Sequence, residues 1–251
     1  MKEKIYPAFP RPEDINCSIW RYLDFDKFIW MLQRKALYMP RADQLGDAFE
    51  GSTTRGHLAQ WRAAAEEETD ETKRQRIENV ISLLSNYTRK FLPMTYVSCW
   101  HMNKVESHAM WKLYTKSSMA VAIASTFERL ENLLPAHANV GVVRYVDFDI
   151  YTYPTENVFH RIMHKRHFFS YEQEVRAVVQ SALQPPDIPQ PDGNHFEGLA
   201  YMPPVDPRQL VTSVVIHPDA SVAFATHIEE ICAMHELPKP TVSGMGGTPT
   251  Y

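Results

Sequence analysis

The sequence predicts an α+β fold, in which short strands and irregular helices follow one another in mixed order. Apolar residues make up 44% of the 251-residue chain and charged residues 22%, which is the balance of a globular protein with a sizeable core. The strand-like runs are short, and the helical segments between them are irregular in length and spacing. This pattern differs from the regular strand–helix alternation of a doubly wound sheet.

The first expected unit spans residues 18–51. Its aromatic and aliphatic run at 19–23 favours a short strand, and Asp24 or Asp26 can cap the helix that follows. The run ALYMP favours a second strand that ends at Pro40. The stretch RADQLGDAFEG is then expected to form a loop that carries Asp43, Asp47 and Glu50.

Residues 57–92 are expected to be helical, with a charged middle, AAAEEETDETKRQR. Two long helices packed as a hairpin are the economical arrangement. The apolar stripe at spacings of three and four consists of Ile77, Val80, Ile81, Leu84, Tyr87 and Phe91. Because the segment carries no pattern typical of catalysis, we interpret it as an insertion or a lid.

The middle of the chain is expected to alternate between strands and helices. MTYVSCWHMN favours a strand, ESHAMWKLYTK a helix and SSMAVAIAST a buried strand. Residues 126–135 favour a helix, VGVVRYVDFD a strand, and TENVFHRIMHKRHFF a basic helix. Past residue 180 we expect a proline-rich loop at 184–207, strands near 198–202 and 211–217, a helix near 220–236, and a flexible tail at 238–251.

The stretch HFFSYEQEVRAVV, residues 167–179, alternates between polar and apolar positions as a half-buried strand does. In an extended chain, Glu172 and Glu174 project to the same side with Cβ atoms about 7 Å apart. Such a pair suits oxocarbenium chemistry, in which one carboxylate stabilises a cationic sugar and the other orients or deprotonates an acceptor. The alternative is a solvated strand face in which Arg176 partly neutralises the two glutamates.

Composition excludes several classes of protein. A net charge of −4 gives no overall electrostatic attraction to nucleic acid, although it is compatible with a local basic patch. No apolar run is long enough to cross a membrane, and MKEKIYPAFPRPED lacks the apolar core of a secretory signal. The three widely spaced cysteines argue for a reducing compartment and against a disulfide framework. We therefore expect a cytoplasmic protein.

Other catalytic and binding motifs are weak. His160, His164 and His167 lack an HExxH pattern and a cysteine pair, and basic residues lie between them, so no metal is expected. GMGG in the tail has no strand before it and no helix after it, which excludes a phosphate-binding loop. Cys99 and His101 could share a strand face, but a cysteine hydrolase needs a third, orienting residue that the sequence does not identify.

Three segments in a fixed order carry a resemblance to a known family. IWRYLD places Arg21 in the first strand, TYVSCW places Ser98 near the end of a later strand, and SYEQEVRAV opens a strand with the glutamate motif. This order resembles the Arg–Ser–Glu class of ADP-ribosyltransferases, whose middle element is commonly Ser-Thr-Ser where this chain has Ser-Cys-Trp. The pattern over residues 18–180 also resembles an uncharacterised bacterial domain family with similar DAFEG, SCW and MWKLY segments.

The resemblance implies a split, mostly antiparallel sheet core with peripheral helices and a helical insertion, in a single catalytic domain over residues 1–251. NAD would lie in the cleft as the substrate. Arg21 would clamp the diphosphate, because a guanidinium makes two-point contacts with phosphate oxygens. Ser98 would hold either the nicotinamide-side ribose or the side chain of Glu174.

The resemblance also implies roles for the remaining candidates. Glu174 would bind the ribose hydroxyl and stabilise the cation as nicotinamide leaves, and Glu172 would face the acceptor nucleophile. Three aromatic residues would stack on nicotinamide or line the cleft, although each is also a candidate for the core: Tyr22, Trp100 and Tyr171.

The expected acceptor is a macromolecule. The basic segment HRIMHKRH could steer RNA or DNA, with Trp111 and Tyr114 as stacking candidates, or it could contact NAD phosphates or an acidic protein. A transferase of this kind would harm its own host, so we expect a toxin or anti-phage effector with a neutralising antitoxin partner. Two alternatives remain, namely an NAD glycohydrolase that uses the same site, and a non-catalytic module that binds nucleic acid or protein.

Overall fold

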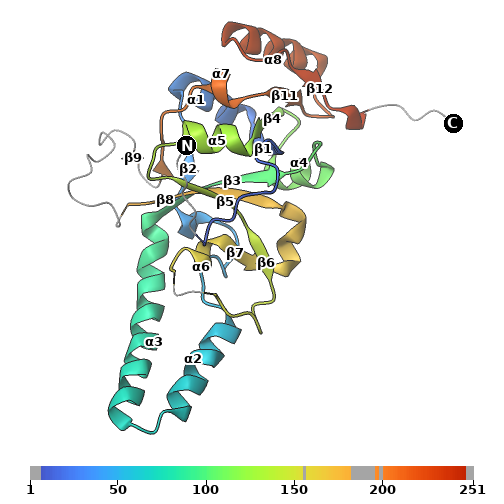
Figure 1. Ribbon diagram of the computed structural model, residues 1–251. Coiled ribbons are helices and arrows are strands. Elements are labelled where there is room, and N and C mark those ends of the chain that lie inside the picture. The colour runs from blue at the N-terminus through green and yellow to red at the C-terminus, as the bar shows by residue number, and fades with distance from the viewer. Residues whose placement is uncertain (1–6, 155–156, 182–195, 198–199, 247–251) are drawn as a thin grey trace, which may run out of the picture.

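A large, open and mostly antiparallel sheet with several helices forms the body of the computed structural model (Figure 1). The structure describes residues 7–154, 157–181, 196–197 and 200–246, without the side chains of 84–90 and 196–197. The strands of the seven-stranded sheet follow the order β12-β11-β4-β1-β3-β8-β5. β11 and β12 pair in parallel and the other neighbours pair antiparallel. The predicted α+β class is confirmed at this level.

The strands of the main sheet are β1 (Ser18–Asp24), β3 (Thr95–Met102), β4 (Ala120–Thr126), β5 (Asn139–Val142), β8 (Glu174–Gln180), β11 (Ser213–Ile216) and β12 (Thr241–Val242). The helices are α1 (Phe25–Arg34), α2 (Arg55–Glu67), α3 (Glu71–Phe91), α4 (His108–Tyr114), α5 (Phe127–Leu133), α6 (His160–Met163), α7 (Pro207–Leu210) and α8 (Val222–Met234). Short strands form two small sheets, one of β2 (Met39–Pro40), β9 (Phe196–Glu197) and β10 (Ala200–Tyr201), and one of β6 (Arg144–Val146) and β7 (His164–Arg166). Short 3₁₀ helices are η1 (Ala42–Gln44), η2 (Leu92–Met94), η3 (His167–Glu172) and η4 (Gly244–Gly246).

The main sheet is divided between its two central strands. β1 pairs with β4 along its whole length, and β3 pairs with β8 from Thr95 to His101. β1 and β3, by contrast, pair only at Ile19 with Met102 and at Trp20 with His101. Beyond Trp20 the ladder ends, and the side chains of Arg21 and Ser98 meet across the gap instead. This separation of the two half-sheets positions the site.

Helices cover both faces of the sheet. On one face, α1, α5 and α8 pack against strand residues that include Leu23 and Val175, and form the largest core (Figure 1). On the other face, α4 packs Met110 and Trp111 against the β1–β4 half. α6 covers the β3–β8 half of that face with Ile162 and Met163. This second face is therefore covered in two separate patches.

The predicted helical hairpin is present as α2 and α3, which project together from the body of the molecule (Figure 1). The predicted apolar stripe does not form a buried core along it. Val80 is 51% exposed, whereas Phe91 at the base is buried. Leu84 and Tyr87 of the stripe lie outside the described side chains. The hairpin is thus fixed to the body mainly at its base.

Three sequence predictions of local structure are wrong. The basic helix is reduced to the four residues of α6, followed by β7, because Arg161 and Lys165 turn inward and are buried. The first half of the predicted strand at 167–179 is the 3₁₀ helix η3. The flexible tail instead contributes β12, which pairs with β11, and η4, while residues 247–251 lie outside the described part.

Two further predictions need qualification. Asp24 stands at the N-cap position of α1, but its carboxylate accepts a hydrogen bond from the backbone N–H of Lys116 and not from the helix. Of the predicted proline-rich loop at 184–207, residues 184–195 and 198–199 lie outside the described residues. In the described part of the chain, none of the helices combines the length and the apolar composition that crossing a membrane requires.

Candidate functional site

A cleft of about 510 Å³ lies where β1 and β3 separate. Its volume falls within the usual range of ligand sites. The separation lets side chains from both sheet faces and both half-sheets line one space. Every predicted site residue except Ser98 lines it: Arg21, Tyr22, Trp100, Tyr171, Glu172 and Glu174.

Arg21 forms one wall of the cleft and is held in place by three groups. Its Nη1 donates to Ser98 Oγ at 3.1 Å and its Nη2 donates to the carbonyl oxygen of Tyr38 at 2.8 Å. Its guanidinium carbon lies 5.9 Å from the centre of a Trp100 ring. Burial lowers the pKa of Arg21 to about 10, so the group stays cationic at neutral pH. The wall therefore presents an oriented positive charge.

Ser98 supports Arg21 and not Glu174. Its Oγ accepts hydrogen bonds from Arg21 and from the indole N–H of Trp100, and the residue is fully buried. In the β3–β8 register Ser98 lies opposite Ala177, so it projects to the sheet face away from Glu174. The predicted alternative in which Ser98 holds the glutamate is therefore wrong.

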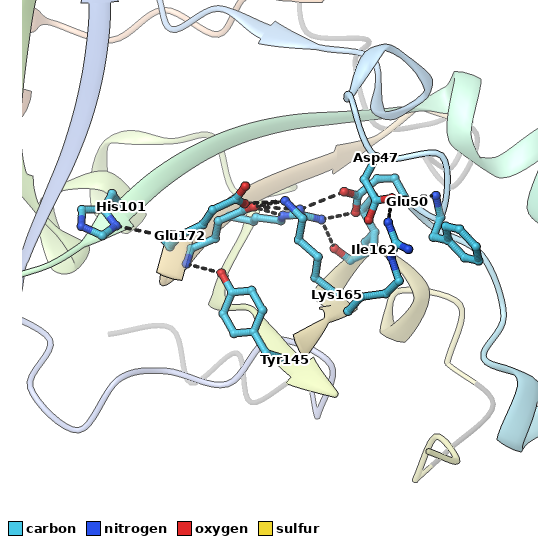
Figure 2. Close-up of polar contacts among 11 residues, drawn as sticks. Asp47, Glu50, His101, Tyr145, Ile162, Lys165 and Glu172 are labelled. Carbon is cyan, nitrogen blue, oxygen red and sulfur yellow. Dashed lines mark hydrogen bonds and ion pairs between the residues drawn. The ribbon is translucent and has the colours of Figure 1, made fainter. Parts of the chain in front are cut away.

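The opposite wall carries a buried network of charged side chains (Figure 2). Glu174 Oε1 accepts from Lys165 Nζ at 2.8 Å, and its Oε2 accepts from Arg176 Nε at 2.5 Å. Lys165 also donates to Glu172. Arg176 donates to Glu50 at 2.5 Å and to the carbonyl oxygen of Ile162 at 2.6 Å. These contacts join two cations and three carboxylates in one connected array.

The two glutamates at the cleft differ in their affinity for protons. Burial raises the pKa of Glu172 to about 7, and its hydrogen bond with Glu174 adds to the rise. Burial also disfavours ionisation of Glu174, but the positive charges of Arg176 and Lys165, together with hydrogen bonds from Glu172 and Arg176, outweigh it and hold the pKa of Glu174 well below its usual range. Glu172 is consequently the group of the network that changes charge near neutral pH.

The charges of the array nearly balance. Arg176 pairs with Glu50, and Lys165 pairs with Glu174, in contacts whose side chains are all less than a tenth exposed. The fifth member, Glu172, then decides whether the wall is neutral or carries one negative charge. Because its pKa is near 7, the wall becomes negative as the pH rises through neutrality.

The geometry of the glutamate pair differs from the predicted strand. Glu172 ends η3, Gln173 adopts the left-handed conformation with φ of 40°, and β8 begins at Glu174. The two residues are thus joined by a tight turn rather than by extended backbone. Their carboxylates still meet, because Lys165 on β7 contacts both of them.

The aromatic candidates fall into two groups. Trp100 is 1% exposed, and Tyr22 is buried with its hydroxyl accepting a hydrogen bond from the backbone N–H of Ser107. Both belong to the core and show only part of their surface to the cleft. Tyr171 is 47% exposed at the rim, where Tyr114 of α4 is also exposed.

The predicted basic surface for nucleic acid is absent from this part of the described structure. Arg161 and Lys165 are buried, and Arg166 pairs with Asp47. The stacking candidate Trp111 is buried, and its indole N–H donates to Glu106. These residues therefore offer no exposed basic face.

A cysteine nucleophile is not favoured. Cys99 lies beneath the network, where burial and the negative charge of Glu174 raise the pKa of its thiol. The neighbouring His101 does not activate the thiol, because the Nδ1 of His101 bonds to the carbonyl oxygen of Glu172 at 2.7 Å.

Among the described residues, no group of three or more His, Cys, Asp or Glu side chains is arranged to hold a metal ion.

Sequence reasoning missed most of the network. Lys165 sat in an expected solvent-exposed helix, and Glu50 in a loop far away along the chain. The sequence does place Arg176 beside Glu174, because residues two apart on a strand share a face, but as part of a solvated strand face, whereas the residue is buried. Tyr145, whose hydroxyl accepts a hydrogen bond from the Glu174 backbone N–H, left no sequence signal.

Comparisons with known proteins do not identify a family for this chain. No protein-family model matches the chain. A search of curated proteins likewise returned no match. The function is therefore inferred from the residues of the cleft and their geometry.

Substitution of Glu172 by glutamine tests its raised pKa. A folded-state pKa above the ordinary value means that this group favours the folded protein at acid pH, and that this contribution is lost as the pH rises through about 7. We expect Glu172→Gln to raise the melting temperature at pH 8 by about 2–4 °C and to leave it unchanged at pH 4. Thermal unfolding of the variant, with the exposed Glu66→Gln as control, measures this. A lower melting temperature for Glu172→Gln at pH 8 would refute the assignment.

Proposed function

We propose that the protein is an NAD-dependent ADP-ribosyltransferase that modifies a macromolecule, with an ADP-ribosyltransferase-like split-sheet core. One observation carries the proposal. A single cleft between two half-sheets has an oriented guanidinium, Arg21, on one wall and two carboxylates, Glu172 and Glu174, on the other. Transfer from NAD needs a cation for the diphosphate and an anion for the ribose that becomes positively charged.

Arg21 is suited to the diphosphate. Its contacts with Ser98 and the Tyr38 carbonyl use two of its five N–H donors and fix the plane of the guanidinium. A planar group held in this way can make two-point contacts with phosphate oxygens at little entropic cost. Ser98 acts in this proposal by orienting Arg21.

Glu174 is suited to the ribose on the nicotinamide side. When the bond between the ribose carbon and the nicotinamide nitrogen breaks, its electron pair leaves with nicotinamide and the sugar becomes an oxocarbenium ion. A carboxylate that accepts a hydrogen bond from the 2′-hydroxyl stabilises that charge. Arg176 and Lys165 hold the carboxylate in position, and Glu50 offsets the charge of Arg176.

Glu172 is suited to act as the base for the acceptor. In its ionised form it can take a proton from a hydroxyl or amine of the acceptor as the new bond to the sugar forms. Because its pKa is about 7, this form dominates above neutrality. Transfer is then expected to speed up as the pH rises through about 7.

The rim of the cleft offers contacts for a macromolecular acceptor. Exposed aromatic rings stand at the rim of the cleft, at Tyr38, Tyr114 and Tyr171. Such rings can stack on a base of RNA or DNA, or pack against side chains of a protein. A cytoplasmic toxin or anti-phage effector restrained by an antitoxin partner is the setting we expect for this activity. Overexpression without a partner should then slow growth of the host.

The test uses NAD with a radiolabel in its adenylate half. The protein is incubated with NAD alone and with RNA, DNA or cell lysate, while nicotinamide release and label transfer are followed. Transfer to an acceptor supports the proposal and identifies the acceptor class. Release without any transfer would instead indicate an NAD glycohydrolase. No release under any condition would refute catalysis on NAD and favour a non-catalytic binding module.

Arg21→Lys tests the diphosphate contact. Lysine keeps the charge but loses the planar fork, so we expect the KM for NAD to rise by about 10- to 100-fold. Arg11→Lys is the matched control, because Arg11 is half exposed and pairs with Glu131 away from the cleft. A KM for Arg21→Lys equal to that of the control would contradict the role.

A further inference from the structure

His101 occupies the closed end of the cleft. It lies opposite Trp20 in the last residue pair before β1 and β3 separate, and opposite Glu174 in the β3–β8 register. The ring is 6% exposed and lines the cleft. It therefore stands at the point where the two half-sheets and the glutamate motif meet.

The ring of His101 holds the backbone at Glu172. Its Nδ1 lies 2.7 Å from the Glu172 carbonyl oxygen, and because a carbonyl only accepts, Nδ1 carries the proton (Figure 2). Asn103 Nδ2 lies 3.4 Å from the other ring nitrogen, Nε2. The tautomer and the orientation of the ring follow from these contacts.

The same hydrogen bond secures a strained turn. Gln173, between the two glutamates, has φ of 40°, a conformation that non-glycine residues adopt at some cost. Its carbonyl oxygen accepts from the backbone N–H of Met102, so two consecutive residues of β3 hold the turn. Without this hold, the turn has less to keep Glu172 folded back beside Glu174 and Lys165.

We propose that His101 is the positioning residue that holds the carboxylate of Glu172 at the acceptor side of the cleft. This inference rests on the proposed function, in which Glu172 serves as the base. It goes beyond it by assigning the alignment of that base to a histidine on a neighbouring strand. A base displaced by about 1 Å can lose about 100-fold in rate.

Two substitutions separate the hydrogen bond from the space that the ring fills. His101→Leu fills the space of the ring with an apolar side chain of similar size and removes the Nδ1–H donor. His101→Asn places an amide N–H where Nδ1 was. The titratable and charged groups that surround Glu172 and could also move its protonation are Lys165, Glu174, Arg176, Tyr114 and Tyr145. Both variants leave all of them in place.

The kinetic arm measures the rate at which the adenylate label is transferred from NAD to an acceptor in cell lysate across pH, because Glu172 takes its proton in that step. We expect His101→Leu to lower kcat by about 100-fold with KM for NAD within twofold of the wild type. The midpoint of its pH profile should move from about 7 toward the ordinary range of a glutamate, and His101→Asn should restore most of the rate and the midpoint. An unchanged profile in His101→Leu, or equal impairment of both variants, would overturn the proposal.

The second arm needs no NAD. Carboxyl carbon NMR of ¹³C-labelled glutamate follows the titration of Glu172, assigned by its absence in Glu172→Gln. A midpoint that falls in His101→Leu and is kept in His101→Asn supports the positioning role, and a midpoint that stays at the wild-type value refutes it. If the wild type releases no nicotinamide, the proposed function fails while this arm still decides the role of His101.

Discussion

Glu174→Gln is expected to lower the rate of nicotinamide release from NAD by about 100- to 1000-fold. Glutamine keeps the shape of the side chain and removes the negative charge that the cationic ribose needs. The loss should fall on kcat, with little change in KM for NAD, because the charge on the sugar develops only in the transition state. Steady-state kinetics with NAD at pH 8 measure this effect.

Glu50→Gln is the matched control for Glu174→Gln. Both glutamates bind Arg176, both side chains are 4% exposed, and both substitutions remove one partner of the same cation. A loss that came only from weakening the network would therefore appear in both variants. We expect Glu50→Gln to stay within tenfold of the wild type. Equal losses in the two variants would show that Glu174 has a structural role alone.

Arg176→Met is expected to destabilise the protein by about 3–5 kcal/mol. Arg176 is 1% exposed, and its removal leaves the carboxylates of Glu50 and Glu174 buried without their main cation. At about 2–4 °C per kcal/mol for a chain of this size, the melting temperature should fall by at least 6 °C. Chemical denaturation gives the free energy, and thermal unfolding gives the shift.

Arg208→Met provides the comparison for Arg176→Met. Arg208 also pairs with two carboxylates, Asp206 and Glu236, but its side chain is 51% exposed. Exposed pairs contribute little to stability because water screens them, so this variant should unfold close to the wild type. Similar costs for the two substitutions would contradict the view that burial makes the Arg176 network expensive to break.

Local patterns in the sequence predicted the parts of the fold that local physics decides. The strand at Arg21, the strand at Ser98 and the hairpin of α2 and α3 follow from short-range spacing of apolar residues, and they are confirmed. The motifs also predicted that Arg21, Glu172 and Glu174 share a site, and these three residues do line one cleft. These features depend little on partners far away in the chain.

The remaining features depend on distant partners. The segment HRIMHKRH has the composition of an exposed helix, but Glu172 and Glu174 draw Lys165 into the interior, and Asp47 pairs with Arg166. Alternation in HFFSYEQEV suggested a strand, whereas the hold of β3 on residues 172 and 173 favours a tight turn. Compensated burial of charge and a left-handed residue are tertiary effects that periodicity does not reveal.

The role of Ser98 depends on the register between strands, which a sequence motif does not specify. Its position in the sequence was compatible with support of either the ribose or Glu174. The pairing of β3 with β8 places it on the face away from Glu174, where it orients Arg21 and Trp100. A one-residue difference in register would have reversed this outcome, because successive strand residues point to opposite faces.

A crystal structure of Glu174→Gln with NAD bound tests the proposed site most directly. We expect the diphosphate in contact with Arg21 and the nicotinamide-side ribose hydroxyl within hydrogen-bond distance of residue 174, with NAD spanning the gap between β1 and β3. NAD bound elsewhere, or a cleft that stays empty at millimolar NAD, would contradict this expectation.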